Sequence, residues 1–247
     1  MIPDWHLTTL WIGPVPIQVW GLFVALGFAL AIILAVRRAP RFGINPVDVV
    51  DFSAWAIVAA FLGARLFHVL IYEYAYYLAH LDEIVRVWEG GLSSSGGFIG
   101  AAIAGVWFVH RRRIRLIAFA DCIVGALPLG YAVGRLGCHF TRMHPGPTCS
   151  GGAFCFRFPD GALRLEMASL EIVLWIAIAL AVAAFRKRLA GDGRVTALVI
   201  GWYGVGRFAL DFLRVGDATY FGLTPAQYLS AVLTLIGIAL FVRARKK

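Results

Sequence analysis

Long apolar runs alternate with short polar segments along the chain, and this pattern predicts a bundle of membrane-spanning helices. Each run is close to the roughly 20 residues that a helix needs to cross about 30 Å of hydrocarbon. A membrane barrel is excluded, because no ten-residue alternation recurs and open sheet edges are not stable in lipid. The seven predicted spans cover residues 17–37, 48–72, 93–110, 115–139, 168–185, 196–214 and 225–242. The sequence thus predicts an all-α polytopic membrane protein, with residues 1–247 forming one domain.

The distribution of basic residues predicts the orientation of these spans. Of the 23 Lys and Arg residues, 15 flank the spans on one side and only five on the other. Basic residues accumulate on the cytoplasmic side of membrane proteins, so we expect the C-terminus inside and the N-terminus outside. The charges surround the spans instead of forming one patch, so nucleic-acid binding is not indicated.

Two segments on the predicted outer side differ from the rest. Residues 73–91 are aromatic and acidic and are interpreted as an interfacial arm, whereas residues 141–167 are rich in Gly and Pro. The second segment contains Cys149 and Cys155, which on this topology face an oxidising compartment. The sequence leaves open whether they form a local disulfide. Cys122 and Cys138 fall inside the fourth span and are interpreted as buried small hydrophobes.

Three arginines lie inside predicted spans: Arg65, Arg135 and Arg207. A charge at bilayer depth costs at least about 2.5 kcal/mol, so such residues face a bundle interior, where they pair with counter-charges or bind an anionic group. A lipid headgroup is such a ligand. No Cys–His spacing predicts a zinc site.

Acidic and aromatic residues accompany these arginines at helical spacing. Tyr203, Arg207 and Asp211 form one stripe of the sixth span. Asp121 and Arg135 are 14 residues apart and are expected to share a face of the fourth span, and Glu171 opens the fifth. An open alternative is that Arg207 only pairs with Asp211 within its helix and fixes that helix in place.

Glycine-rich stretches occur beside these polar groups, and the motifs together resemble one family. Gly96 and Gly97 enter the third span, where small residues permit either a close helix crossing or an anion at a helix start. The matching segments are residues 63–67, 90–100, 130–137 and 203–214. In order and spacing they resemble the bacterial prolipoprotein diacylglyceryl transferases, whose fold is a seven-helix membrane bundle with the N-terminus outside.

The resemblance implies a reaction in the bacterial cytoplasmic (inner) membrane. Such enzymes move a diacylglyceryl group from phosphatidylglycerol to the cysteine thiol of a prolipoprotein signal peptide, so that a thioether forms and glycerol phosphate leaves. It implies no cofactor and no metal, partners among membrane lipids, and a monomer. Arg135 and Arg207 match the family's essential arginines, and two guanidiniums suit a phosphodiester because each donates through a bidentate fork. The other residues expected to bind substrate are Arg65, Trp20, Gly96, Gly97, Asp121, Tyr203, Asp211 and Glu171.

The chain departs from the family pattern at the groups that handle protons. Ser95 stands where the family has a histidine, and Cys138 and His139 replace an Asn. Trp20 replaces a Tyr, and Leu165 replaces a His. Ser95, His139 and His144 are therefore the candidates for the catalytic position, with the base expected at His139 or His144.

Two other functions remain open at this stage. The first is a paralogue that binds or moves anionic phospholipid, or transfers a different group. The second is a transporter or channel, which is disfavoured because the chain has no inverted repeat and no matching pair of broken helices.

Overall fold

The computed structural model describes residues 6–87, 90–185 and 191–245, and it is built mainly from long helices. In chain order the elements are β1 (Thr9–Ile12), β2 (Val15–Gln18), α1 (Val19–Arg38), η1 (Ala39–Phe42), α2 (Pro46–Phe67), η2 (His68–Tyr72), α3 (Tyr74–Ala79), η3 (Leu81–Val85), α4 (Ser94–Arg112), α5 (Leu116–Val124), α6 (Leu127–Thr141), β3 (Pro145–Thr148), β4 (Cys155–Arg157), β5 (Leu163–Glu166), α7 (Met167–Phe185), α8 (Arg194–Asp211) and α9 (Pro225–Arg245).

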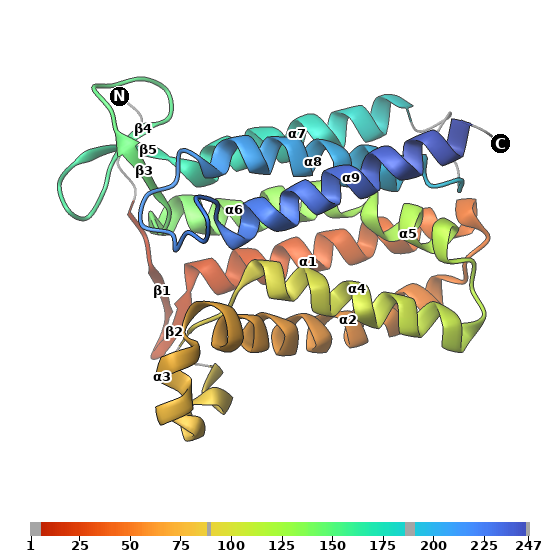
Figure 1. Cartoon of the computed structure of the whole chain (residues 1–247), viewed down its shortest axis with the longest axis horizontal. Coiled ribbons are helices and arrows are strands. Elements are labelled where there is room, and N and C mark those ends of the chain that lie inside the picture. Colours follow the sequence, from red (N-terminus) through yellow and green to blue (C-terminus); the bar gives the residue numbers. More distant parts are fainter. Residues whose placement is uncertain (1–5, 88–89, 186–190, 246–247) are drawn as a thin grey trace.

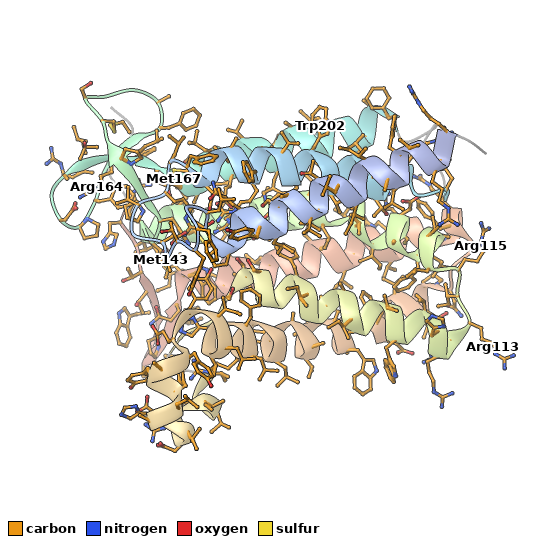
Figure 2. All side chains as sticks on the ribbon, in the orientation of Figure 1. Arg113, Arg115, Met143, Arg164, Met167 and Trp202 are labelled. Atoms are coloured by element: carbon orange, nitrogen blue, oxygen red, sulfur yellow. A yellow bond between two sulfur atoms is a disulfide. The ribbon has the colours of Figure 1, made fainter. Side chains whose placement is uncertain are left out.

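The long helices lie side by side, and the short strands and α3 gather at one end of the bundle, here called the sheet end (Figure 1). Helix α9 ends at the opposite end of the bundle. Figure 2 places Arg164, Met143 and Met167 at the sheet end and Arg113 and Arg115 at the other. The described parts of the two segments predicted to lie on the same side of the membrane, 73–91 and 141–167, therefore lie at the same end of the molecule.

Four helical stretches among the described residues are long and apolar enough to cross a membrane. They are Val19–Phe42, Pro46–Tyr72, Met167–Phe185 and Pro225–Arg245. The bent pair α5 and α6 would make a fifth. Helices α4 and α8 do not pass this test of length and composition; α8 carries the charges of Arg194, Arg207 and Asp211 within 18 residues.

Two features of the predicted fold were wrong in detail. The fourth predicted span is not one helix, because it breaks between α5 and α6, which differ in direction by 40°. Pro128 stands in the first turn of α6, where its missing N–H costs nothing. The all-α prediction also omitted two small antiparallel sheets, β1–β2 and β3–β5–β4; the second lies outside the predicted spans, and β2 overlaps the first span at Ile17 and Gln18.

Glycines allow three pairs of helices to approach closely. A side chain at Gly96 of α4 would collide with Gly63 and Phe67 of α2, and one at Gly27 of α1 would collide with Gly130 of α6. In α8 and α9, Gly201 and Gly237 face each other in the same manner. Backbone contact through small residues replaces the hydrophobic driving force that is missing between helices in lipid.

The outer segment between α6 and α7 is held by a sheet and a disulfide. Strand β5 lies between β3 and β4, with Arg164 paired to both Thr148 and Phe156. Cys149 and Cys155 form the disulfide that the sequence left open, with their Cα atoms 6.1 Å apart. Cys122 and Cys138 are free and buried, as predicted.

Candidate active site

A buried layer of charged side chains joins α6, α7 and α8. Nε of Arg135 lies 2.7 Å from Oε2 of Glu171, and NH1 of Arg207 donates to Oε1 of the same carboxylate over 2.7 Å. NH2 of Arg207 lies 2.8 Å from Oδ1 of Asp211. The side chains of Arg207, Glu171 and Asp211 are at most 4% exposed, and that of Arg135 is 11% exposed. We call these four residues the arginine layer.

The arginine layer corrects the view of Arg207 as one half of an intrahelical pair. Arg207 contacts Glu171 of α7 as well as Asp211 of its own helix, so it also ties two helices together. Asp211 in turn accepts a hydrogen bond from the hydroxyl of Thr224 and lies 4.0 Å from Arg214. Each carboxylate therefore serves more than one cation or donor.

Within the described part of the chain, the terminal nitrogens of Arg135 have weak hydrogen-bond acceptors as partners. NH1 contacts Sγ of Cys138 at 3.6 Å, and NH2 donates to the hydroxyl of Tyr131 over 3.3 Å. A thiol and a neutral phenol accept hydrogen bonds less strongly than a charged oxygen does. These two nitrogens are accordingly the best donors of the layer for an incoming anion.

Three aromatic residues form a floor beneath the layer, on the side away from the sheet end. Tyr131 precedes Arg135 by four residues, Tyr203 precedes Arg207 by four, and Trp175 follows Glu171 by four. The ring centroids of Trp175 are 4.6 Å from those of both Tyr131 and Tyr203. The three packed rings therefore cover the layer on the side away from the sheet end.

His144 stands above the layer, in the segment between α6 and β3. The backbone N–H of Met167, the first residue of α7, donates to its carbonyl over 3.3 Å. Its Nδ1 is fully buried and has no hydrogen-bond partner among the described residues. Burial, followed by the nearby charges of Arg135 and Arg214, lowers the pKa of the His144 imidazole to about 3. The ring is therefore neutral at neutral pH.

His139 belongs to a different cluster. Its Nδ1 lies 3.0 Å from Oε2 of Glu166 and 2.9 Å from Oγ of Ser169. Glu166 is fully buried and accepts hydrogen bonds from the backbone N–H groups of Ala168 and Ser169, at the start of α7. A carboxylate there satisfies orphan donors and complements the helix dipole. The cluster fixes the start of α7.

Comparison with known proteins identifies the family. The family model described as "Prolipoprotein diacylglyceryl transferase" matches residues 8–243. The chain belongs to the prolipoprotein diacylglyceryl transferase family. It is a multi-pass protein of the bacterial cytoplasmic membrane.

Curated relatives named phosphatidylglycerol–prolipoprotein diacylglyceryl transferase match nearly the whole chain. The Streptococcus uberis protein is 31% identical over 245 residues, which cover 96% of this chain and 94% of the relative. A Streptococcus agalactiae protein is 32% identical over 245 residues, with 96% and 95% covered. A Streptococcus pyogenes protein is 30% identical over 244 residues, with 95% and 93% covered. The resemblance drawn from the sequence motifs is thus confirmed.

Asp121, which the sequence placed on the same face as Arg135, lies elsewhere in this family member. Its fully buried carboxylate accepts hydrogen bonds from the backbone N–H of Gly193 and from both the N–H and the hydroxyl of Thr196. It therefore caps the start of α8, 11 residues or about 16 Å before Arg207. The break between α5 and α6 ends the helical periodicity on which the shared face depended.

Arg65 is engaged by the backbone of the outer arm. Its guanidinium donates to the carbonyls of Glu83, Ile84, Gly90 and Gly91, and it lies 5.0 Å from the ring centroid of Tyr77. These contacts fasten the arm to the end of α2. A role of Arg65 in substrate binding remains a prediction.

Ser95 borders the site, whereas Gly96 serves a helix crossing. Phe98 packs on Tyr131 and Tyr203 of the floor, with ring centroids 5.7 and 6.0 Å apart. Ser95 lies three residues earlier on the same face of α4, one turn nearer the sheet end, and is 5% exposed. Gly96 packs against Gly63 of α2, while Gly97 has only ordinary contacts.

Trp20 lies in the first turn of α1, and its backbone packs against Gly137 of α6. The side chain is 39% exposed. The structure thus brings Arg135, Glu171, Arg207 and Asp211 together in one layer, with Tyr203 in the floor beneath it. It places Trp20 where α1 packs against α6.

Sequence reasoning missed Tyr131, Trp175 and Glu166. The first two were detectable, because each lies four residues from a charged group of the layer on the same helix. Glu166 directly precedes a long apolar run, which is where an acidic helix-start residue is expected. Among the described residues, no group of three or more His, Cys, Asp or Glu is arranged to hold a metal ion.

Proposed function

We propose that this chain transfers a diacylglyceryl group from phosphatidylglycerol to the lipobox cysteine thiol of prolipoproteins, and that the arginine layer binds the lipid phosphate. The proposal rests on family membership for the reaction and on Arg135 for the site. Among the described residues, NH1 and NH2 of Arg135 have a thiol and a phenol as hydrogen-bond partners. Two phosphate oxygens are stronger acceptors in the geometry that a guanidinium fork favours.

In this proposal Arg207 supplies a fixed positive charge to the site, whereas Arg135 supplies the N–H donors for the phosphate. It is held between Glu171 and Asp211, so its guanidinium is fixed before substrate arrives. As the bond between the glycerol carbon and the phosphate oxygen breaks, the leaving phosphate gains negative charge. Fixed cations in a site with little water stabilise that charge without rearranging. Glu171 keeps both guanidiniums at one depth.

The proposed topology is seven spans with the sheet end outside and the C-terminus in the cytoplasm. Support comes from the 15 basic residues on the opposite side and from the disulfide at the sheet end, which suits an oxidising compartment. Helices α4 and α8 count as spans in this proposal. Helix α4 packs closely along α2, and α8 packs closely along α9, and both α2 and α9 are long and apolar enough to cross a membrane. We also propose that the chain works as a single domain and as a monomer, which size-exclusion chromatography with light scattering in detergent tests.

The function is tested by reconstitution. The purified protein is supplied with phosphatidylglycerol vesicles and a synthetic lipobox peptide, and the peptide mass is measured. We expect the peptide to gain a diacylglyceryl group, and an Arg135→Ala variant to give none. Native mass spectrometry of both proteins reports bound lipid. If wild-type protein retains phosphatidylglycerol but modifies no peptide, the paralogue that only binds lipid is the better description.

A further inference from the structure

Among the described residues the buried Nδ1 of His144 has no hydrogen-bond partner, and it lies at the edge of a site whose reaction must deprotonate a thiol. We propose that His144 is the general base for the acceptor thiol, and that it becomes effective only after a lipid phosphate lies between it and the arginines. The inference rests on the proposed function, because it assumes that the arginine layer holds the phosphate.

The path of the chain brings His144 over the layer. Helix α6 ends at Thr141, and Arg142 adopts a left-handed conformation with φ 50° that turns the chain back. The carbonyl of His144 then accepts from the N–H of Met167. Met167 and Glu171 are four residues apart on one face of α7, so His144 lies about one turn above the carboxylate that joins the two arginines. Figure 2 shows Met143 and Met167, which flank this position, at the sheet end.

The surrounding charges explain why the resting ring is neutral. Among the described residues, the positive charges that act on His144 are those of Arg135 of α6, Arg214 just beyond α8, and Arg207 of α8. Glu171 of α7 is the carboxylate that opposes them. In the tautomer that carries its proton on Nε2, the neutral ring leaves the lone pair of Nδ1 free inside the protein.

The same charges make the ring a poor base before lipid binds. A neutral imidazole whose conjugate acid has a pKa of about 3 takes few protons from a thiol, whose unperturbed pKa is about 8.5. A bound phosphodiester adds one negative charge beside the arginines and so raises the pKa of His144. A second negative charge develops as the leaving phosphate departs, and it raises that pKa further. Lipid binding thereby makes His144 a stronger base, so the thiol is deprotonated only when the lipid with which it reacts is bound.

The step balances without an added reactant. The proton of the thiol moves to Nδ1, and the sulfur forms a bond to the glycerol carbon of the diacylglyceryl group. The bond from that carbon to the phosphate oxygen breaks, and its electron pair stays on the oxygen. Glycerol phosphate leaves, and Nδ1 returns its proton to the phosphate.

The other candidates for the base are less suitable. His139 directs Nδ1 at Glu166 and Ser169, so that nitrogen is already used in fixing α7. The Ser95 hydroxyl borders the site but has no useful basicity near pH 7 and would itself need activation.

The experiment compares His144→Ala with wild type and with His110→Ala, a control at the exposed basic end of α4. Three readouts are collected: kcat with saturating phosphatidylglycerol and lipobox peptide, lipid retention by native mass spectrometry, and kcat with added imidazole. We expect His144→Ala to lower kcat about 100-fold or more, to keep lipid retention within twofold, and to regain activity with imidazole. The control should match wild type.

Each other outcome counts against a specific claim. If His144→Ala keeps kcat within threefold of wild type, the role of His144 as a base is wrong while the proposed function stands. A loss of kcat without imidazole rescue, or together with a loss of lipid, would mean a structural role and overturn the inference. A wild-type enzyme that modifies no peptide would overturn the proposed function and this inference with it.

Discussion

Arg207 of α8 donates to Glu171 of α7 over 2.7 Å, in a pair whose side chains are 4% and 1% exposed. The carboxylate reached by Arg207 is the one that also binds Arg135. Two guanidiniums that would repel each other in an apolar interior are thus held at one level by a single acid between them.

Glu171→Gln should lower the stability of the protein and its kcat, but should leave lipid binding in place. Removing one partner of a buried ion pair costs about 3–5 kcal/mol, and here two arginines lose their shared carboxylate. We expect a lower thermal unfolding temperature in detergent and at least a tenfold loss of kcat, because the guanidiniums are no longer fixed. Retention of phosphatidylglycerol should persist, since the layer gains net positive charge. A variant with lowered stability but full kcat would show that Glu171 only supports the fold.

Arg135→Lys should fail to replace Arg135. Lysine keeps the charge but loses the planar fork that offers NH1 and NH2 together. We expect phosphatidylglycerol retention and kcat/KM to fall in this variant, and the truncation Arg135→Ala to lower them by a factor equivalent to about 2–5 kcal/mol. Arg157→Lys is the matched control, because Arg157 is exposed on β4 and donates to the carbonyl of Gly161. Equal lipid retention in both variants would contradict the proposed role of the Arg135 fork.

Ser95→Ala should change activity by less than threefold, because a serine hydroxyl is not a base at neutral pH. Ser95→His should leave activity intact or raise it, since the new imidazole would stand one turn above Phe98, beside the layer. Peptide modification by the purified variants measures both. If Ser95→Ala lost as much activity as Arg135→Ala, Ser95 would take part in the chemistry.

The disulfide predicts a labelling pattern. In unfolded, unreduced protein, a thiol reagent should modify Cys122 and Cys138 but neither Cys149 nor Cys155. After reduction all four should react, as mass spectrometry of peptides would record. Replacing Cys149 and Cys155 by Ser should cost about 2 kcal/mol, because the closed loop is short. Labelling of both outer cysteines before reduction would show that the bond is absent from the purified protein.

The orientation is tested by reporter fusions. A reporter that is active only in the cytoplasm should be active when fused after Lys247, and one that needs the periplasm should be inactive there. A reporter that needs the periplasm should be active when it is inserted after Gly151, in the loop closed by the disulfide. A reporter that is active only in the cytoplasm should be inactive at the same position. The reverse pattern would invert the proposed topology.

The sequence by itself determined the helices and most of the cluster at the site. The length of the apolar runs specified where helices form, because lipid leaves no other way to pair the backbone. Tyr203, Arg207 and Asp211 were correctly placed on one stripe of α8, since spacings of four residues depend only on helical geometry. Glu171 was recognised as an acid near the start of its span.

Only the tertiary structure decided which partners these residues meet. Glu171 lies 36 residues before Arg207, and Asp121 lies 75 residues before Thr196, so both contacts depend on how helices pack. Asp121 was misplaced because a continuous fourth span was assumed, and the break between α5 and α6 ends that periodicity. His139 and His144 look equivalent in the sequence. His139 lies in the last turn of α6 and contacts Glu166, whereas the turn after α6 leaves His144 over the arginine layer, because contacts between distant segments follow from packing and not from periodicity.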